Sequence, residues 1–566
     1  MKRLPALCGL IAVGTVPFIL LAQDASLNPA VMNDLSTGLW PGYHGDYSGR
    51  HYSPLKQIDA SNARSLSLAW IYRTTSSTQN AIVESDVTAA AAAAQQGRGG
   101  GGGGGGGFGG GAAAGPTIKS IPLVVGGMMY LSVPGHVYAV DARTGVERWH
   151  YATVGGAAIG NRGVGMYGSW LFLETGDNRI VSLDAQTGHE RWHKDLKVTG
   201  SSNFSTSAPV IIRNHVIVGI GGDSGSGIGW VESLDPETGD MQWKWVVTPA
   251  AGEPGVETWP SPEAAAKGAG GPWQPPTYDP ALNLMYMTTG QPTPTYNGRG
   301  RPGANLYTSC VVALNPDTGK MTWYYQFSPH DTHDWDATQV PVLIDGTING
   351  QPRKLLAQAN RNGYYFLLDR TNGKELVAKP FALSNTYKGL DATGTLIPDP
   401  DKEPSPGGSL VFPDSDGAAN YPAPSFSPDT ALFYVNATNA ASIFSAVKDD
   451  TDPTGFARGS EYHLGLFDSS LLALDYRTGA VKWSHHYPQT GFWSSTYPGI
   501  LTTAGGVLFT GDPSGNFIAY DDRSGRILWH APVGATVSNS PETFLMDGKQ
   551  YVVVAARDGL YCFYLQ

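Results

Sequence analysis

Apolar and polar residues alternate in short runs along most of this 566-residue chain. Two such runs are HVYAV, directly before Asp141, and RIVSL, directly before Asp184. Alternation at a period of two is typical of a strand with one buried face. Each run is followed by Asp or Asn, then by a Thr-Gly or Ser-Gly pair and a short returning segment. The pattern predicts antiparallel hairpins in which glycine occupies the tight turn.

The hairpin pattern recurs with a tryptophan eight residues after the Asp or Asn. Six clear copies begin at residues 141, 184, 235, 315, 475 and 521 and end at Trp149, Trp192, Trp243, Trp323, Trp483 and Trp529. A seventh copy, at Asp369, lacks the tryptophan, and a degenerate eighth spans residues 59–70. One such sheet cannot bury its face alone, whereas radially stacked sheets can. We therefore expect an all-β, eight-bladed β-propeller with tryptophans packed between blades; seven blades is the alternative.

Two intervals between copies are longer than one blade requires. The copies at 235 and 315 are 80 residues apart, and those at 369 and 475 are 106 residues apart. Each interval therefore carries long loops or hides a degenerate blade.

The ends and the low-complexity segment set the domain limits. Residues 1–23 combine a basic start, an apolar run at 10–21 and small residues beyond it, so we expect a signal peptide and export to the periplasm, with membrane association as an option. Residues 24–566 are then one propeller domain, in which the Ala/Gly-rich stretch 89–115 is expected to be a disordered loop. The net charge is −11 with no basic stripe, which argues against nucleic acid as a partner. Cys310 and Cys562 could pair in an oxidising compartment, but spacing alone does not decide it.

Longer blocks resemble the pyrroloquinoline quinone (PQQ)-dependent alcohol dehydrogenases. They include WPGYHGDYSGRHYSPL at 40–55, RPGANLYTSCVVALNPDTG at 301–319, SPHDTHDWDATQ at 328–339 and RKLLAQANRNGYYFLLDRTNG at 353–373. The resemblance covers nearly all of the chain after residue 23 and keeps the order of the blocks. It implies an eight-bladed propeller that holds PQQ and a Ca²⁺ or lanthanide ion near the axis and oxidises an alcohol or a sugar. A propeller that kept its blades and lost the cofactor, acting as an envelope scaffold or assembly factor, is the alternative.

The resemblance also implies the residues that bind PQQ, a flat molecule with three carboxylates. Arg162, Thr206, Trp273, Arg361, Asn420 and Trp493 match cofactor-binding positions of the family. Arginine suits a carboxylate because its planar guanidinium donates two parallel hydrogen bonds. Trp273 matches the indole that stacks on the quinone. Arg361 matches the cation beside the reactive quinone oxygens, where it would stabilise charge during reduction.

The resemblance places the catalytic base in the loop at 330–336, HDTHDWD. Aligned without gaps, Asp334 matches the family's catalytic carboxylate and Asp336 matches the extra aspartate of the lanthanide enzymes. An alignment that keeps the Trp-Asp pair makes Asp336 the base instead, at the expense of a two-residue insertion. His330 and His333 leave a separate transition-metal site as a less favoured alternative.

The metal positions depart from the family pattern. A metal-binding Glu is replaced by Ser224, with Asp223 one residue earlier, and a metal-binding Asn is replaced by Gln291. A cofactor-side Glu is replaced by Lys119. Because Ca²⁺ accepts mixed oxygen ligands, we still expect Gln291, Asp334 and Asp336 to hold the metal. No Cys-x-x-Cys-His haem motif occurs in the sequence, so electrons must pass to a separate acceptor, a cytochrome c or a membrane quinone.

Overall fold

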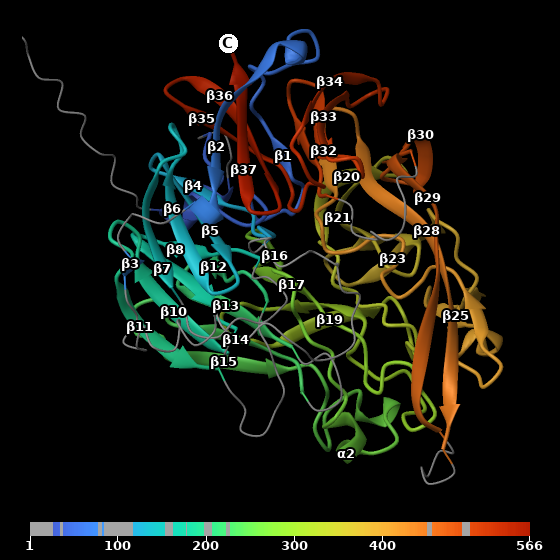
Figure 1. The fold of residues 1–566 in the computed structure, drawn as a ribbon. Coiled ribbons are helices and arrows are strands. Elements are labelled where there is room, and N and C mark those ends of the chain that lie inside the picture. Colours follow the sequence, from blue (N-terminus) through green and yellow to red (C-terminus); the bar gives the residue numbers. More distant parts are fainter. Residues whose placement is uncertain are drawn as a thin grey trace, which may run out of the picture.

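The computed structural model describes residues 27–33, 38–76, 82–83, 117–152, 162–176, 178–196, 206–221, 227–449, 456–488 and 498–566. Regular structure in these ranges is almost entirely β-strand, arranged as eight sheets of four or five strands and one two-stranded ribbon. Figure 1 shows the sheets following one another around a ring in chain order, with the last strands beside the first. This is the predicted eight-bladed propeller.

Blades 1 to 7 are each built on an antiparallel sheet of four consecutive strands. Blades 1 to 4 consist of β4 (Leu123–Val125), β5 (Met128–Val133), β6 (His136–Asp141) and β7 (Glu147–Ala152); β8 (Gly165–Tyr167), β9 (Trp170–Glu174), β10 (Arg179–Asp184) and β11 (Glu190–Asp195); β12 (Val210–Ile212), β13 (His215–Ile220), β14 (Trp230–Leu234) and β15 (Met241–Val246); and β16 (Thr277–Asp279), β17 (Leu284–Thr288), β18 (Cys310–Leu314) and β19 (Met321–Gln326). Blades 5 to 7 consist of β20 (Val342–Ile348), β21 (Gln351–Ala359), β22 (Tyr364–Asp369) and β23 (Lys374–Pro380); β27 (Ser425–Ser427), β28 (Leu432–Lys448), β29 (Phe456–Asp475) and β30 (Ala480–His486); and β31 (Leu501–Thr503), β32 (Val507–Gly511), β33 (Asn516–Asp521) and β34 (Ile527–Pro532).

Blade 8 closes the ring with strands from both ends of the chain. It combines β35 (Glu542–Met546), β36 (Lys549–Ala556) and β37 (Gly559–Leu565) with β2 (Leu66–Arg73), which pairs antiparallel with β37. Strand β2 contains Trp70, the end of the degenerate eighth copy. That copy is therefore a real blade, and the seven-bladed alternative is wrong.

The smaller elements lie around this ring. Strands β1 (Tyr52–Ser53), β3 (Ile82–Val83) and β26 (Ser409–Val411) extend blades 7, 1 and 6, and β24 (Tyr387–Leu390) pairs with β25 (Leu396–Pro398). The helical segments are short: η1 (Pro29–Asn33), η3 (Ala63–Ser65), η4 (Thr74–Ser76), η5 (Val256–Thr258), α2 (Pro262–Ala265) and η6 (Pro400–Lys402). The interval at 235–315 contains η5 and α2. The interval at 369–475 contains β24, β25, η6, β26 and the long β28–β29 hairpin, and no additional blade appears in the described parts of either interval.

The repeat tryptophans join neighbouring blades, as predicted. Trp149 covers the turn glycine of blade 2 so closely that a Cβ on Gly188 would lie 2.6 Å from the indole. Its Nε1 donates to the carbonyl of Ala185 at 3.2 Å. The same glycine contact joins Trp70 with Gly145, Trp192 with Gly239, Trp243 with Gly319, Trp323 with Gly373 and Trp483 with Gly525. Each indole is thus a staple on the positive-φ glycine that its neighbour requires.

Two copies of the repeat lack this contact between a tryptophan and a glycine. The copy at Asp369 lacks tryptophan, and Tyr365 of strand β22 packs on Gly479 of blade 6 instead. Its hydroxyl donates to the carbonyl of Tyr476 at 2.7 Å. Trp529 of blade 7 belongs to the core shared with blade 8, where its ring meets Phe563 edge-on at 5.1 Å. A tyrosine can replace the staple because it also has an apolar ring and a polar tip.

The described residues 27–33 and 38–53 run along the inner strands of the ring. Their hydrogen bonds reach all eight blades, through Leu27 with Gly168, Gly38 with Leu545, Trp40 with Val124, Tyr47 with Ile211 and Tyr278, Ser48 with Leu343, Arg50 with Phe426, and His51 with Thr502. Because these residues contact the strand nearest the axis in most blades, they lie in the axial region of the ring.

Several predictions fall outside the described residues: the signal peptide at 1–23, the loop at 89–115, Asp223, Ser224 and Trp493. Cys310 and Cys562 are buried free thiols in different core clusters, so they do not form a disulfide. Within the described residues, no helix is long and apolar enough to span a bilayer.

Candidate functional site

The candidate residues share one position in the blade repeat. Arg162 precedes β8, Thr206 precedes β12, Trp273 precedes β16, Asp334 and Asp336 precede β20, and Asn420 precedes β27. Arg361 lies in the turn between β21 and β22. The first strand of a propeller blade lies nearest the axis, so residues that enter it at the same end converge although they are distant in sequence.

Trp273 lies close to two arginines of this group. The guanidinium carbon of Arg162 lies 4.3 Å from the indole centroid, and that of Arg361 lies 5.8 Å from it. Tyr421 meets Trp273 edge-on at 6.3 Å and also lies 4.7 Å from the Arg162 guanidinium. Cations over aromatic faces are stabilised by the ring quadrupole, so these contacts fix the arginines and the indole together.

Arg162 is a buried cation with spare hydrogen-bonding capacity. Its Nη1 donates to the carbonyl and the hydroxyl of Thr206 at 2.9 and 2.7 Å, while its buried Nε has no hydrogen-bond partner among the described residues. Burial lowers the pKa of Arg162, and burial together with the charge of Arg162 lowers the pKa of Lys119. These hydrogen bonds go to the neutral Thr206, so they do not balance the charge of the buried cation. The site therefore fits a flat, polyanionic ligand such as a tricarboxylate quinone.

Asp336 connects the other half of the site. Its Oδ1 accepts the backbone N–H of Gln291 at 2.7 Å, and its Oδ2 accepts Trp273 Nε1–H at 3.0 Å. Arg361 Nη2 lies 3.4 Å from Oδ2. The three donors hold the Asp336 carboxylate in place, and the carboxylate in turn orients the indole of Trp273 and the guanidinium of Arg361.

Asp334 enters the site through its backbone. Its φ is 68°, in the left-handed region that costs a non-glycine residue about 1–2 kcal/mol. In this conformation its carbonyl accepts Arg361 Nη1–H at 2.7 Å. The side chain is partly buried, and its charge helps to raise the pKa of Tyr296.

The rest of the loop at 330–336 is held by the protein itself. The buried Asp331 carboxylate accepts the N–H groups of His333 at 3.1 Å and Trp335 at 2.9 Å. His333 stacks on Trp335 at 4.6 Å, and its Nε2 lies 2.9 Å from the carbonyl of Lys402. The Nδ1 of His330 lies 2.8 Å from the carbonyl of Gly303. Each histidine thus has a backbone partner, and no group of three His, Cys, Asp or Glu suited to a metal occurs within the described residues.

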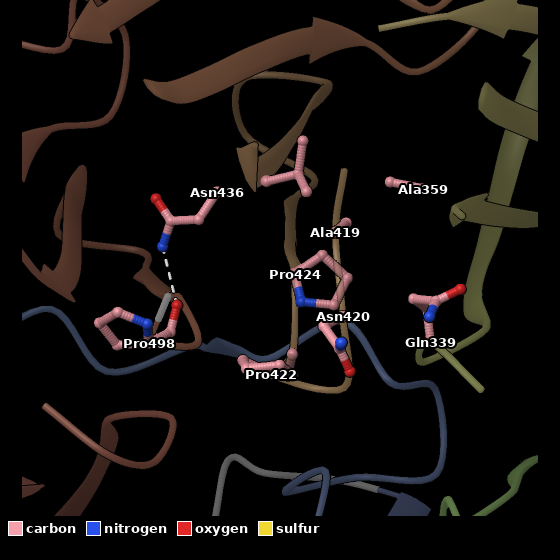
Figure 2. A pocket seen from close by; sticks show the side chains of 10 residues that line it. Gln339, Ala359, Ala419, Asn420, Pro422, Pro424, Asn436 and Pro498 are labelled. Atoms are coloured by element: carbon pink, nitrogen blue, oxygen red, sulfur yellow. Dashed lines mark hydrogen bonds between the residues drawn. The ribbon is translucent and has the colours of Figure 1, made fainter. Parts of the chain in front are cut away.

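A small pocket adjoins Arg361. Figure 2 shows Gln339 and Asn420 at one side of it and Asn436 bonded to the carbonyl of Pro498 at another. Gln339 Oε1 accepts the Arg361 N–H at 3.1 Å, and Asn420 Oδ1 accepts from Arg361 Nη2 at 3.4 Å. The pocket is apolar where Ala419, Pro422 and Val435 line it. Such a mixture of apolar lining and a few polar groups is typical of small-molecule sites.

Gln339 and Tyr421 were not predicted from the sequence. Gln339 contacts Arg361, and Tyr421 contacts Arg162 and Trp273. Tyr421 directly follows Asn420, and Gln339 ends the block SPHDTHDWDATQ. Their positions next to predicted site residues in the sequence could have identified both.

Comparison with known proteins agrees with this geometry. Residues 40–379 match the PQQ family described as glucose/ethanol/alcohol dehydrogenase, beta-propeller domain, and residues 468–564 match outer membrane protein assembly factor BamB. Quinohemoprotein alcohol dehydrogenase ADH IIB of Pseudomonas putida is 31% identical over 554 residues, covering 92% of this chain and 73% of the relative. Quinohemoprotein alcohol dehydrogenase of Comamonas testosteroni is 33% identical over 564 residues, with the same coverage of 92% and 73%.

Solved structures give the same result. The crystal structure of the Comamonas testosteroni quinohemoprotein alcohol dehydrogenase has a TM-score of 0.79 at 30% identity, covering 96% of this chain and 83% of that one. A europium-containing methanol dehydrogenase also has a TM-score of 0.79, at 26% identity, covering 95% of this chain and 99% of that one. The chain therefore belongs to the β-propeller family of the PQQ glucose, ethanol and alcohol dehydrogenases.

Proposed function

We propose that this protein is a PQQ-dependent oxidoreductase that removes hydride from an alcohol and passes the electrons to a separate acceptor. The observation that carries the proposal is the pair of buried guanidinium groups, Arg162 and Arg361, that both lie close to the Trp273 ring. A flat polyanion would fit both the arginines and the indole, because its carboxylates can pair with the guanidinium groups and its ring can stack on Trp273. Membership in a family of PQQ alcohol dehydrogenases supports the same chemistry.

The residues of this chain have distinct tasks in the proposal. Arg162, Thr206 and Lys119 would bind cofactor carboxylates, Trp273 would stack on the ring system, and Asn420 and Trp493 match two further cofactor-binding positions of the family. When bound, PQQ supplies the electron-pair acceptor of the reaction. Arg361 stabilises negative charge that develops beside it. Asp334, the match to the family's catalytic carboxylate in the gap-free alignment, takes the proton of the substrate hydroxyl.

A hard metal ion fits the oxygen donors near the loop. Gln291, Asp334 and Asp336 offer amide and carboxylate oxygens, which suit Ca²⁺ or a lanthanide better than a transition metal. Three residues provide fewer protein ligands than the six to eight oxygens that Ca²⁺ takes. We therefore propose that the metal binds well only together with the cofactor carboxylates, and that Ca²⁺ is the default ion.

Export completes the proposed setting. The basic and apolar residues at 1–23 favour a signal peptide and therefore a periplasmic location. In the periplasm the protein could pass electrons to a soluble or a membrane acceptor. A cytochrome c or a membrane quinone is the proposed electron acceptor, because relatives of this chain are named 1-butanol dehydrogenase (cytochrome c) and alcohol dehydrogenase (quinone).

Reconstitution tests the function. The purified protein is titrated with PQQ in the presence of Ca²⁺ or a lanthanide, and dye reduction is followed with short alcohols and aldoses. We expect saturable PQQ binding and alcohol-dependent dye reduction, and Arg162→Ala as a matched variant that binds PQQ more weakly. A protein that takes up no PQQ and reduces no dye with any substrate contradicts the proposal and favours the scaffold alternative.

A further inference from the structure

The residue directly after the Asp or Asn of the repeat carries a charge in two of the seven copies between 141 and 521. It is Arg370 in blade 5 and Asp522 in blade 7, whereas the other copies have alanine, proline or tyrosine there. Both charged residues are buried, with exposed fractions of 4% and 1%. The same place in the fold thus holds a buried cation in one blade and a buried anion in another.

The backbones at the two positions make the same contacts. The carbonyl of Arg370 accepts Trp323 Nε1–H of the preceding blade at 3.2 Å, and the carbonyl of Asp522 accepts Trp483 Nε1–H at 3.1 Å. A buried tyrosine of the preceding blade also donates to each carbonyl. Each backbone N–H donates to a carbonyl beside the second strand of its own blade. The two side chains therefore start from equivalent points between neighbouring blades.

Around Arg370 the fold presents oxygen atoms. Its Nε donates to Asp279 Oδ2 of blade 4 at 2.8 Å. Its Nη1 donates to the backbone carbonyls of Ile344 and Leu355 at 2.9 and 3.1 Å. Its Nη2 donates to the exposed carboxylate of Asp345 at 2.5 Å. A cation at this place is therefore matched by carboxylate and carbonyl oxygens.

Equivalent oxygens surround Asp522, although Asp522 is itself an acid. The strand register of blade 7 repeats that of blade 5, so the carbonyls of Thr503 and Val507 take the places of the two carbonyls described above. Ser427 ends the first strand of blade 6, where blade 4 has its buried aspartate. Asp522 Oδ1 lies beside Gly506, since a Cβ on that glycine would be 3.8 Å away. Gly506 N–H donates to the Thr503 carbonyl at 3.0 Å, which leaves that oxygen a second lone pair.

The acidic group and its neighbours lack donors. Both carboxylate oxygens of Asp522 and the hydroxyl oxygen of Ser427 are buried and have no hydrogen-bond partner among the described residues. Arg523 follows in the sequence, but it is exposed and makes no hydrogen bond to Asp522 in the described structure. A buried carboxylate that faces other acceptors is costly unless a cation neutralises it. The missing partner of Asp522 is therefore a cation.

The available ligand atoms are all oxygens. Asp429, in the exposed turn after β27, adds a second carboxylate on the solvent side. It accepts the Tyr52 hydroxyl at 2.7 Å, and strand β1, which contains Tyr52, pairs with β31 of blade 7. Carboxylate, hydroxyl and carbonyl oxygens without nitrogen or sulfur suit a hard cation such as Ca²⁺.

We propose that a calcium ion binds between blades 6 and 7 and joins them. It takes the place that the guanidinium of Arg370 occupies between blades 4 and 5, and water completes its six to eight oxygens. The turn after the third strand lies at the end of a blade opposite to the start of the first strand, so this site is separate from the one around Trp273. The ligands are the residues Asp522, Asp429, Ser427, Thr503 and Val507, the last two through their carbonyls.

Calcium binding to the PQQ-free, full-length protein tests the site. The protein is treated with chelator and then titrated with Ca²⁺, while heat release and melting temperature are followed. Asp522→Asn keeps the shape of the side chain and removes its charge. Asp512→Asn is the matched control, because Asp512 is another buried carboxylate of blade 7, whose Oδ2 accepts from Asn516 Nδ2 at 2.8 Å. Asp336→Asn detects any ion held on the cofactor side.

A double variant replaces the proposed ion by an arginine. Ser427→Asp combined with Asp522→Arg copies the pair of Asp279 and Arg370 into blades 6 and 7. Because the guanidinium would supply the positive charge, this variant should need no Ca²⁺. Its melting temperature in chelator should lie near that of the wild-type protein with Ca²⁺ and should not change when Ca²⁺ is added.

We expect the wild-type, Asp512→Asn and Asp336→Asn proteins to bind one Ca²⁺ without PQQ and to melt at a higher temperature with Ca²⁺ than with chelator. Asp522→Asn should bind Ca²⁺ about tenfold more weakly or worse, since affinity depends on the charge of the ligands. A wild-type protein without Ca²⁺ binding or a melting shift at millimolar Ca²⁺ overturns the proposal, and would mean that the Asp522 carboxyl is protonated. Binding that is unaltered in Asp522→Asn, or that is lost in Asp336→Asn instead, also overturns it.

Discussion

Two aspartates two residues apart should respond differently to the same substitution. Asp336 accepts Gln291 N–H and Trp273 Nε1–H and lies beside Arg361, whereas Asp334 contacts Arg361 through its backbone carbonyl. An Asp→Asn change keeps the shape of the side chain and removes its charge. In Asp334 it also preserves the backbone contact, and asparagine tolerates the left-handed φ of 68° at least as well as aspartate.

The expected magnitudes follow from these contacts. In Asp336→Asn the new NH₂ faces one of two N–H donors, and a buried donor without an acceptor costs about 1–3 kcal/mol. PQQ or metal affinity should therefore fall by about 5–150-fold, since about 1.4 kcal/mol corresponds to a factor of ten. Asp334→Asn should retain PQQ and lose turnover by about 10²–10⁴-fold, as expected when a general base is removed.

Equilibrium PQQ titration and dye-linked kcat distinguish the two outcomes. Activity of Asp336→Asn should return at high PQQ and metal concentrations, and that of Asp334→Asn should not. Full turnover in Asp334→Asn, together with none in Asp336→Asn at any metal concentration, refutes this assignment. It would make Asp336 the base and favour the gapped alignment.

Further predictions concern the tryptophan staples and two buried histidines of the axial segment. Trp149→Ala should lower the free energy of unfolding by about 3–5 kcal/mol in denaturant titration, and Trp149→Phe by less, because Tyr130 still donates to the Ala185 carbonyl. Equal losses would show that ring burial is not the main contribution. Burial lowers the pKa of His44 to about 4, and burial lowers that of His51 well below its usual 6.5. Both rings are thus held neutral, so their stabilisation is present above pH 6.5 and is lost as the pH falls towards 4. Melting temperature should drop in that window, and a flat profile contradicts the prediction.

The repeat made the fold predictable, and its exceptions were beyond reach. A glycine turn and an indole at fixed spacing predict the same contact between neighbouring blades, and six of the eight copies make it, so the eight copies predicted eight blades. Tyr365 could not be predicted as a staple, because it comes from strand β22 rather than from the position of the missing tryptophan. The described residues 27–33 and 38–53 contact the blades largely through backbone atoms, which leave no periodic side-chain signal.

The site was predictable where residues enter a blade and not where insertions cover it. The predicted Arg162, Trp273, Asp336 and Arg361 come together because each lies at the axial end of a blade strand. The long β28–β29 extension was not predicted, because its length follows no repeat.

The most direct test of the central claim is equilibrium binding of PQQ to the purified protein, followed in the same sample by alcohol-dependent dye reduction. We predict saturable binding at one site, strengthened by Ca²⁺ or a lanthanide and weakened in Arg162→Ala, with dye reduction that appears only when PQQ and an alcohol are both present. PQQ binding that is absent, or that is identical in Arg162→Ala and unaccompanied by any alcohol oxidation, would contradict the account.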